Sequence, residues 1–426
     1  FDAFPPVGSK EKSLAGSLRV LVTYSAGLKT NRDVWAFQFS QSKLESNIRR
    51  LIAAYEKQRA LRSTDSRHEL DRDSTQIKWD GTLEASLAKN TSISFEPRAL
   101  RTAMYRPFCK QVAYFDRDLN NSVYQLPSLF PTPGHANFGF YITAPGAGHQ
   151  FSLVASREIP DLAFWGSGSG QFFPRYSYEK RVTDENQLGG FDGDVQDEYT
   201  RIDNVTDDIL ADYRATYGDE VTKDDIFFYV YGLLHSPEYR ERFAADLKKM
   251  LPRIPKVSDF WGFAKAGRTL SGLHLGYEEI EPWPLEEVVS GKPDNLFHVK
   301  KMTYAGKRPK LDKSRVIVNE HLTLTGIPDE AHEYMLGSRS ALDWILERYQ
   351  IKKDKASGIV NDPNDWGKEH GDPRYIVDLV KRITRVSVET VAIVKSLPPL
   401  DILDASTSDK DQREKSPGTK ASVRFE

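Results

Sequence analysis

The sequence predicts an α+β protein: a small, twisted, mostly antiparallel sheet with long loops, followed by a mainly helical C-terminal half. Two observations predict this fold class. Between Ile77 and about Tyr178, short aromatic and apolar runs alternate with glycine and proline, which is typical of short strands joined by elaborate loops. Beyond Asp225, apolar residues recur at the spacing of one helix face.

Residues 1–76 are predicted to form a connector made of a strand, a polar loop and a helix. The run SLRVLVTY, residues 17–24, has the apolar character of a buried strand, and the polar loop after it contains GLKTNRD. Ser40 is predicted to cap a helix, because apolar residues follow it at helical spacing. These are Leu44, Ile48, Leu51, Ile52 and Tyr55. Residues 61–76 are charged and predicted to form a loop.

Residues 77–180 are predicted to be a β-rich subdomain, and residues 181–225 an acidic linker with a solvated helix. Residues 226–400 are predicted to be mainly helical, with one β-hairpin whose strands, 296–304 and 315–324, enclose the basic loop AGKRPKLDKS. The polar residues 401–426 are expected to be disordered.

Capping signals place the helices of the C-terminal half. The run TKDD at Thr222 resembles a capping box, and Pro237 suits the first position of the next helix, which is expected to carry Tyr239 to Met250. Further helices are predicted from Ala341 to Tyr349 and after Pro373.

The composition limits the classes of function. The chain has 426 residues and a formal net charge of −2, so binding to nucleic acid would need a local basic face. Its single cysteine, Cys109, excludes an internal disulfide framework and suits a reducing cytoplasm. No apolar run approaches the roughly 18 residues that span a bilayer. Because the chain opens at Phe1 without a methionine, we expect a piece of a longer protein.

The glycine-rich run DLAFWGSGSGQFFPRY, residues 161–176, is not a nucleotide loop. A P-loop needs a lysine after its last glycine, and here Gln171 and two phenylalanines follow. A dinucleotide fingerprint needs a helix at the glycines, and Pro174 argues against one. Two interpretations remain open: a surface loop between strands, or a loop whose backbone closely approaches a bulky ligand such as a DNA groove.

No pattern indicates a catalytic centre or a metal ion. The histidines are scattered without a helical pair, and GSGSG has the wrong flanks for a nucleophile elbow. Asp362 in NDPNDW is expected to build a turn, and Cys109 is expected to be a buried, inert thiol. We therefore predict no catalytic residue, no metal and no cofactor in this chain.

Dense runs of polar and basic residues indicate a different chemistry. Their amide, hydroxyl and cationic side chains are the types that contact phosphate oxygens and base edges. The candidate DNA-binding residues are Lys29, Thr30, Asn31, Arg32, Arg106, Arg117, Asn120, Asn121, Gln171 and Arg175. The hairpin loop adds Lys307, Arg308, Lys310, Lys313 and Arg315. In each case a solvated turn is the alternative.

A series of motifs resembles a known family. The series is YSAGLKTNRDVW from Tyr24, YRPF from Tyr105, FFPRY, SPEYRERF with LPRIP, and SGIVNDPNDW from Ser357. From about Phe4 to Pro399, the chain resembles the C-terminal target-recognition region of type ISP restriction–modification enzymes and related N6-adenine DNA methyltransferases.

The resemblance implies a module that recognises a specific sequence in double-stranded DNA within a single-chain restriction–modification enzyme of the bacterial cytoplasm. It implies a methyltransferase and a helicase-like translocase with a nuclease in cis, which would use S-adenosylmethionine, ATP and Mg. Residues 1–76 would then connect to the methyltransferase. The motif NPPY and the Walker and helicase motifs are not in this chain, so no catalytic role is transferred to its residues.

Two alternatives to DNA recognition remain. One is a self-contained enzyme with an unrecognised carboxylate or serine site, and the other is a scaffold that binds proteins. DNA recognition requires the candidate side chains to meet on one concave cationic surface, with Lys29, Arg32, Arg106 and Arg117 exposed on it.

Overall fold

The structure, a computed structural model, describes residues 1–8, 19–181, 198–307 and 309–403. Small, mostly antiparallel sheets are joined by long loops and flanked by helices, so the predicted α+β class is confirmed. Within these residues, no helix combines the length and the apolar character needed to cross a membrane. The predicted tail, 401–426, lies almost entirely outside the described residues.

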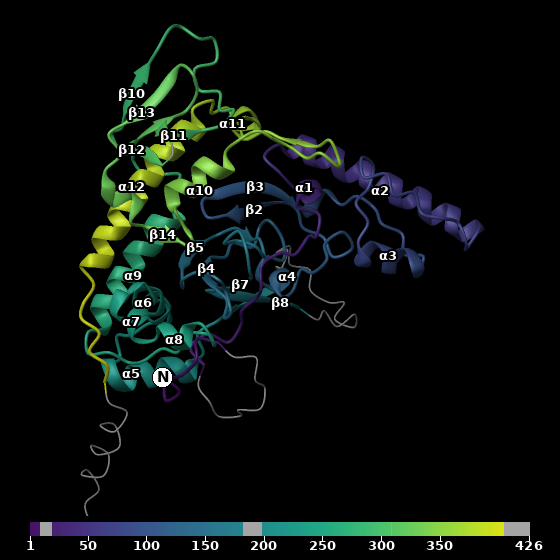
Figure 1. Cartoon of the computed structure of the whole chain (residues 1–426). Helices are drawn as coiled ribbons and strands as arrows, with labels where there is room; N and C mark the ends of the chain where they lie inside the picture. The colour runs from purple at the N-terminus through teal and green to yellow at the C-terminus, as the bar shows by residue number, and fades with distance from the viewer. Residues whose placement is uncertain (9–18, 182–197, 308, 404–426) are drawn as a thin grey trace, which may run out of the picture.

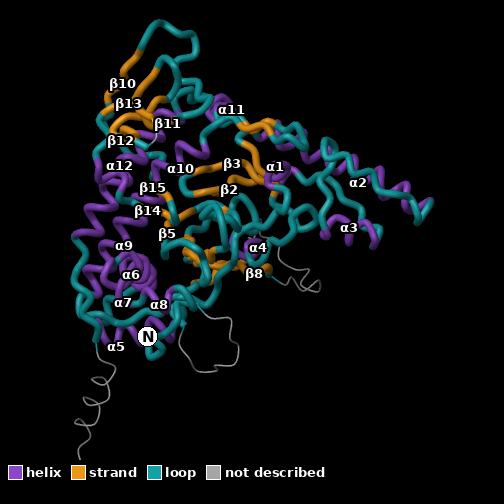
Figure 2. Tube along the Cα trace, viewed as in Figure 1, coloured by secondary structure: helices purple, strands orange, loops and turns teal. Residues whose placement is uncertain are grey.

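Two small sheets occupy the centre of the molecule (Figure 2). The first has the order β1 (Phe37–Gln38), β3 (Cys109–Tyr114), β2 (Leu100–Arg106) and β6 (Ile159–Pro160). The second has the order β5 (Leu153–Ser156), β4 (Gly139–Thr143) and β7 (Gly170–Pro174). Their ladders are antiparallel except for the pairing of β2 with β6. A separate ribbon pairs β8 (Tyr176–Lys180) with β9 (Tyr199–Asp203).

The N-terminal helices lie on one side of these sheets. They are α1 (Asp33–Ala36), α2 (Gln41–Thr64), α3 (Gly81–Ala88) and α4 (Leu126–Leu129). The cap predicted for α2 is confirmed, since the Ser40 side chain accepts a hydrogen bond from the N–H of Lys43 at 3.1 Å. Figure 1 shows α2 projecting away from the sheets, with α3 beneath it.

Helices also cover the opposite side. They are α5 (Asp207–Tyr217), α6 (Lys223–His235), α7 (Pro237–Arg242), α8 (Ala244–Leu247) and α9 (Phe260–Leu275). The capping box of Thr222 and Asp225 at the start of α6 is present as predicted. Two glycines let α6 and α9 cross closely. A Cβ atom on Gly232 would lie 2.2 Å from the carbonyl oxygen of Phe263, and one on Gly267 would lie 1.9 Å from that of Phe228.

The C-terminal part adds a third sheet, with the order β10 (Glu286–Val289), β13 (Leu322–Thr325), β12 (Lys310–Ile317) and β11 (Thr303–Lys307). Short pairs follow: β14 (Met335–Leu336) with β15 (Arg339–Ser340), and β16 (Lys352–Lys353) with β17 (Val360–Asn361). The remaining helices are α10 (Ala341–Arg348), α11 (Asn364–Glu369) and the long α12 (Tyr375–Lys395). The third sheet lies at the upper end of α12 in Figure 1.

Three expectations about local structure were wrong. Residues 19–24 form no regular strand; Val22 and Thr23 instead donate backbone hydrogen bonds to the main chain and side chain of Asn204. The predicted basic loop is mostly strand, because β11 and β12 pair up to Lys307 and Lys310. The helix expected over Tyr239 to Met250 breaks at Phe243, between α7 and α8.

Two buried apolar clusters hold the elements together. One joins the first sheet to α2, α10 and α12. The other joins the second sheet to α6 and α9. Burial of apolar area contributes about 25 cal/mol per Å², so these clusters supply most of the driving force that fixes the loops between them.

Two histidines lie inside the helical half. His274 is hydrogen-bonded through Nδ1 to the hydroxyl of Tyr231 at 2.6 Å and through Nε2 to the hydroxyl of Thr390 at 2.9 Å. Burial lowers the pKa of His274 to about 3. Burial also lowers the pKa of His235, and nearby Arg240 and His274 lower it further. Both imidazoles are therefore neutral in the folded protein at neutral pH.

This arrangement predicts loss of stability in mild acid. Below the ordinary imidazole pKa of about 6.5, the unfolded chain takes up protons that the folded chain does not, so stability falls as the pH falls. Each such histidine contributes about 1.4 kcal/mol per pH unit in this range. Urea unfolding between pH 4.5 and 7 should give a shallower pH dependence for His274→Gln than for the wild type. The exposed control His298→Gln should leave the slope unchanged, and equal slopes for all three proteins would contradict the prediction.

Candidate nucleic-acid interface

Residues 25–32 join three separate parts of the chain through main-chain hydrogen bonds, and we call this segment the seam. The pairs are Ser25 with Phe172, Leu28 with Pro160 and Leu162, and Lys29 with Ser122. The hydrogen bonds of these pairs are 2.7 to 3.0 Å long. The seam therefore brings together β7, the segment from the end of β6 to Leu162, and the loop after β3, although the sequence separates the seam widely from all of them.

The seam requires a glycine at its centre. A Cβ atom on Gly27 would lie 2.3 Å from the carbonyl oxygen of Asp161 and 2.6 Å from the nitrogen of Leu162. Both are backbone atoms, so no side chain can turn aside to make room. The close approach of two main chains explains why the polar loop begins with this residue.

A buried ion pair supports the seam from below. The guanidinium of Arg106, at the end of β2, contacts the carboxylate of Asp161 at 2.5 Å. Burial raises the pKa of the Asp161 carboxyl, while Arg106 opposes this rise and favours the carboxylate. The same guanidinium lies 3.9 Å from the ring centre of Tyr105, whose hydroxyl is 3.3 Å from a carboxylate oxygen of Asp33. The network ties β2 to the middle of the seam, where Leu28 pairs with Pro160 and Leu162, and to Asp33 directly after its end.

A second ion pair anchors the end of the seam. Arg32 is 1% exposed, and its guanidinium contacts the carboxylate of Asp80, which also caps α3 through the N–H of Leu83 at 3.0 Å. Thr30 is equally buried; its hydroxyl donates to Asp33 and accepts from the N–H of Arg32 at 3.1 Å. These contacts fix the fold of the loop itself.

Two more candidates have internal partners. The amide of Asn120 donates to the carbonyl oxygens of Tyr114 and Asp116, at 2.8 and 2.7 Å, and so closes the turn after β3. Arg175 pairs with Asp203 and with Asp224, whose carboxylate is 2.7 Å from its Nε.

The expectation that all candidates face outward therefore needs a correction. Five of them are 5% exposed or less and make contacts within the protein: Thr30, Arg32, Arg106, Asn120 and Arg175. In particular, Arg32 and Arg106 do not add to an exposed cationic surface with Lys29 and Arg117. Sequence reasoning identified the cations and amides of these loops but could not show that acidic and main-chain groups elsewhere in the chain engage these five.

The other five candidates reach the surface at least partly. Asn31 and Arg117 are exposed, and Lys29, Asn121 and Gln171 are half-buried. Asn31 has a φ of 55°, a left-handed conformation that turns the chain sharply beside the buried Arg32. Asn121 lies next to Ser122, the partner of Lys29, and its amide donates to the hydroxyl of Thr82 at 3.0 Å. The structure thus brings Lys29, Asn31 and Asn121 together beside the start of α3.

Two exposed residues near the seam were missed. Tyr124 is 43% exposed and has a φ of 46°. The next residue, Gln125, is also exposed, and its N–H donates to the Ser25 hydroxyl at 3.1 Å. Their position directly after the predicted Asn120 and Asn121 was the available signal. An exposed aromatic ring beside amide groups suits contact with a base or sugar.

The glycine–serine run divides into two parts. Residues 166–169 are exposed, and Gly166 and Gly168 have φ values of 84° and 74°, so they form a tight surface turn. Gly170 is buried in β7, where a Cβ atom would lie 2.0 Å from the ring of Tyr141. The run therefore contains a surface loop of the kind expected, and contact of this loop with a ligand stays a prediction.

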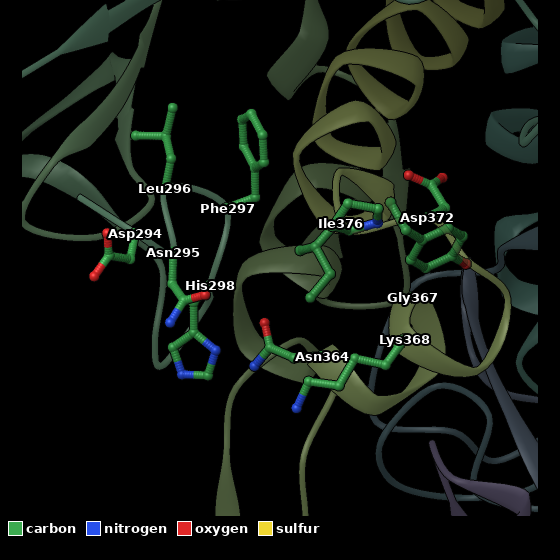
Figure 3. Close-up of a pocket in the computed structure, with 12 residues that line it drawn as sticks. Asp294, Asn295, Leu296, Phe297, His298, Asn364, Gly367, Lys368, Asp372 and Ile376 are labelled. Atoms are coloured by element: carbon green, nitrogen blue, oxygen red, sulfur yellow. The ribbon is translucent and has the colours of Figure 1, made fainter. Parts of the chain in front are cut away.

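A cavity of about 360 Å³ lies away from the seam. Figure 3 shows it between the segment Asp294–His298 and the helices α11 and α12, with Phe297 and Ile376 facing it. One of its polar residues, Asn364, has a structural role, since its side-chain amide both donates to and accepts from the backbone of Val299, at 2.8 Å in each case. The described residues hold no cluster of histidine, cysteine and carboxylate side chains suited to a metal ion.

Cys109 is fully buried in β3, as predicted. Burial raises the pKa of its thiol to about 11, so the reactive thiolate is scarce at neutral pH. This accords with an inert structural residue.

The family model described as the Type ISP C-terminal specificity domain matches residues 19–379. No curated protein matches the chain.

Several solved structures are similar to the chain. The ATP-dependent Type ISP restriction-modification enzyme LlaBIII bound to DNA has a TM-score of 0.82 and 29% identity, over 95% of this chain and 24% of that one. A nuclease-deletion mutant of the Type ISP restriction-modification enzyme LlaGI in complex with a DNA substrate mimic has a TM-score of 0.80 and 31% identity, over 95% of this chain and 35% of that one. The DrdV–DNA complex has a TM-score of 0.79 and 29% identity, over 94% of this chain and 38% of that one. The chain thus spans well under half the length of each.

The seam predicts a strong effect of a single methyl group. Gly27→Ala should separate residues 27–28 from residues 161–162 and lower the free energy of unfolding by about 1–3 kcal/mol, the usual cost of overpacking. The matched control is Gly81→Ala, because a Cβ atom there meets nothing within 4 Å. Urea unfolding of both variants checks this, and equal stability would show that the main chains at the seam can separate without cost.

The buried ion pair predicts a second effect. Asp161→Asn removes the nearest counterion of the buried Arg106, since the carboxylate of Asp33 lies 4.0 Å away, and we expect the free energy of unfolding to fall by about 3–5 kcal/mol. The control is Glu198→Gln, which breaks an exposed pair with Lys180 and should cost far less, because water screens exposed pairs. Similar small losses for both variants in urea unfolding would mean that Arg106 is not held by Asp161.

Proposed function

Because the chain belongs to the family of Type ISP C-terminal specificity domains, we propose that it recognises a specific sequence in double-stranded DNA through the loops gathered by the seam. The observation that carries the proposal is that three solved structures of DNA complexes match this chain over almost its whole length. The loops supply the chemistry. Exposed amides can pair with base edges, and Lys29 and Arg117 can contact phosphates.

Asn31 is the side chain we expect to read a base. An amide can donate and accept together at an adenine edge, and its conformation, fixed by the buried Arg32 and Thr30, reduces the ordering needed on binding. Asn121 and Gln125 are the neighbouring amides. Lys29 can set the register by contact with a phosphate, which carries no sequence information.

The parent protein is part of the same proposal. We propose that this module directs an adenine methyltransferase and an ATP-dependent translocase with a nuclease, all in the same polypeptide and acting in the bacterial cytoplasm. S-adenosylmethionine, ATP and Mg would be used by those domains, and this chain would contribute the choice of DNA sequence.

The proposal predicts different effects for two kinds of residue. Asn31→Gly, which tolerates the left-handed backbone, should reduce discrimination at one base pair by about 1–3 kcal/mol, roughly 5- to 150-fold in relative affinity. Lys29→Ala should weaken binding to specific and scrambled duplexes equally and reduce the salt slope by about 0.9. Fluorescence anisotropy at several salt concentrations measures both effects. The specific duplex carries the sequence around the adenines that the parent enzyme modifies.

The matched control is Asn90→Gly. Asn90 is also exposed with a φ of 55°, but it follows the far end of α3. Equal affinity of the wild type for specific and scrambled DNA would exclude sequence recognition. Binding to neither duplex would favour the protein-interaction scaffold.

A further inference from the structure

A cavity of about 250 Å³ is lined by Asp33, the residue directly after the seam. It lies where α1 and β3 meet the end of α10 and the β16–β17 pair, and its wall includes Arg348, Lys352 and Lys353. We call it the cation pocket. α1 begins at Asp33, immediately after the seam, so the pocket and the seam share one turn of the chain.

The two carboxylates of the cation pocket are already engaged. Asp33 accepts from the hydroxyl of Thr30 and faces the hydroxyl of Tyr105 at 3.3 Å. Asp354 accepts from the N–H and hydroxyl of Ser357, at 2.8 and 2.7 Å. Neither carboxylate forms an ion pair with a cation of the pocket in the described part of the chain.

The cations, in contrast, are incompletely paired. Lys352 and Lys353 have no ion-pair partner among the described residues. Arg348 contacts Glu347 at 2.9 Å, but Glu347 is shared with Arg339 at 2.6 Å. The Nε of Arg348 is buried and has no hydrogen-bond partner among the described residues. Burial lowers the pKa of both Lys352 and Arg348. The charge of Arg348 lowers the pKa of Lys352 further, the charge of Arg106 lowers that of Arg348, and Glu347 only partly offsets these effects.

The cations of the pocket lie on elements that hydrogen bonds and ring contacts hold in place. Lys352 pairs with Asn361 and Lys353 with Val360 across β16 and β17. The side chain of Asn361 accepts from the N–H of Phe39 at 3.0 Å and donates to Gln111 at 3.2 Å, so the ribbon is fixed to β1 and β3. The side chain of Arg348 lies over the ring of Trp344, 5.4 Å from its centre.

We propose that the cation pocket binds a phosphate group. Arg348 offers a planar fork of donors and Lys352 a point charge, the two chemistries that proteins combine at phosphates. A phosphate of the DNA backbone bound here would fix α1, and through Asp33 it would fix the seam that presents Asn31. The role in DNA binding rests on the proposed function, whereas the affinity for phosphate does not.

The first experiment measures DNA binding. Lys352→Ala should reduce the salt slope of DNA affinity by about 0.9. It should weaken binding to specific and scrambled duplexes by the same factor, because a phosphate contact is independent of sequence. The matched control is Lys265→Ala, an exposed lysine of α9 without an ion-pair partner among the described residues, which should leave the slope unchanged. An unchanged slope for Lys352→Ala would exclude a DNA phosphate as the occupant.

The second experiment tests the pocket without DNA. Inorganic phosphate, compared with chloride at equal ionic strength, should raise the melting temperature of the wild type and of Lys265→Ala but not of Lys352→Glu. Stabilisation by phosphate with an unchanged DNA slope would identify a free phosphate or nucleotide as the ligand. No stabilisation together with an unchanged slope would overturn the proposal. Failure to bind any DNA, with phosphate binding intact, would count against the proposed function alone.

Discussion

The buried contact between Arg106 and Asp161 is the interaction on which the loops depend. It joins the end of β2 to the segment that receives the seam, and it does so where water is excluded. A charge at such a position is tolerated only with its partner, because desolvation is costly. The pair therefore holds two loops in one arrangement, and the exposed side chains of those loops inherit a fixed geometry.

The parts of the fold that could be predicted from the sequence are those set by neighbouring residues. Ser40 caps α2, and Thr222 with Asp225 caps α6, because each signal acts within one helical turn. α9 was missed because glycines interrupt its apolar pattern and lower its helix propensity. Those glycines have a purpose that only the fold reveals, since Gly267 lies against the backbone of α6.

The candidate site shows the same limit. The sequence shows that the loops are dense in donors, but a cation in a sequence does not reveal whether it is already paired. Arg106 meets its partner 55 residues away, and Arg32 meets Asp80 at the start of a helix that was not predicted. Asn31, by contrast, has a backbone conformation that leaves its side chain exposed. Pairing across the fold, rather than residue type, separates structural residues from candidate contacts.

Cys109 gives the molecule a practical property. Since it is the only cysteine in these 426 residues and its thiol is enclosed in β3, maleimide reagents at neutral pH have no ready target on the folded chain. A thiol introduced on the projecting helix α2 would consequently carry a dye at one defined point. Energy transfer from that dye to a labelled duplex would then report the separation of α2 and the bound nucleic acid.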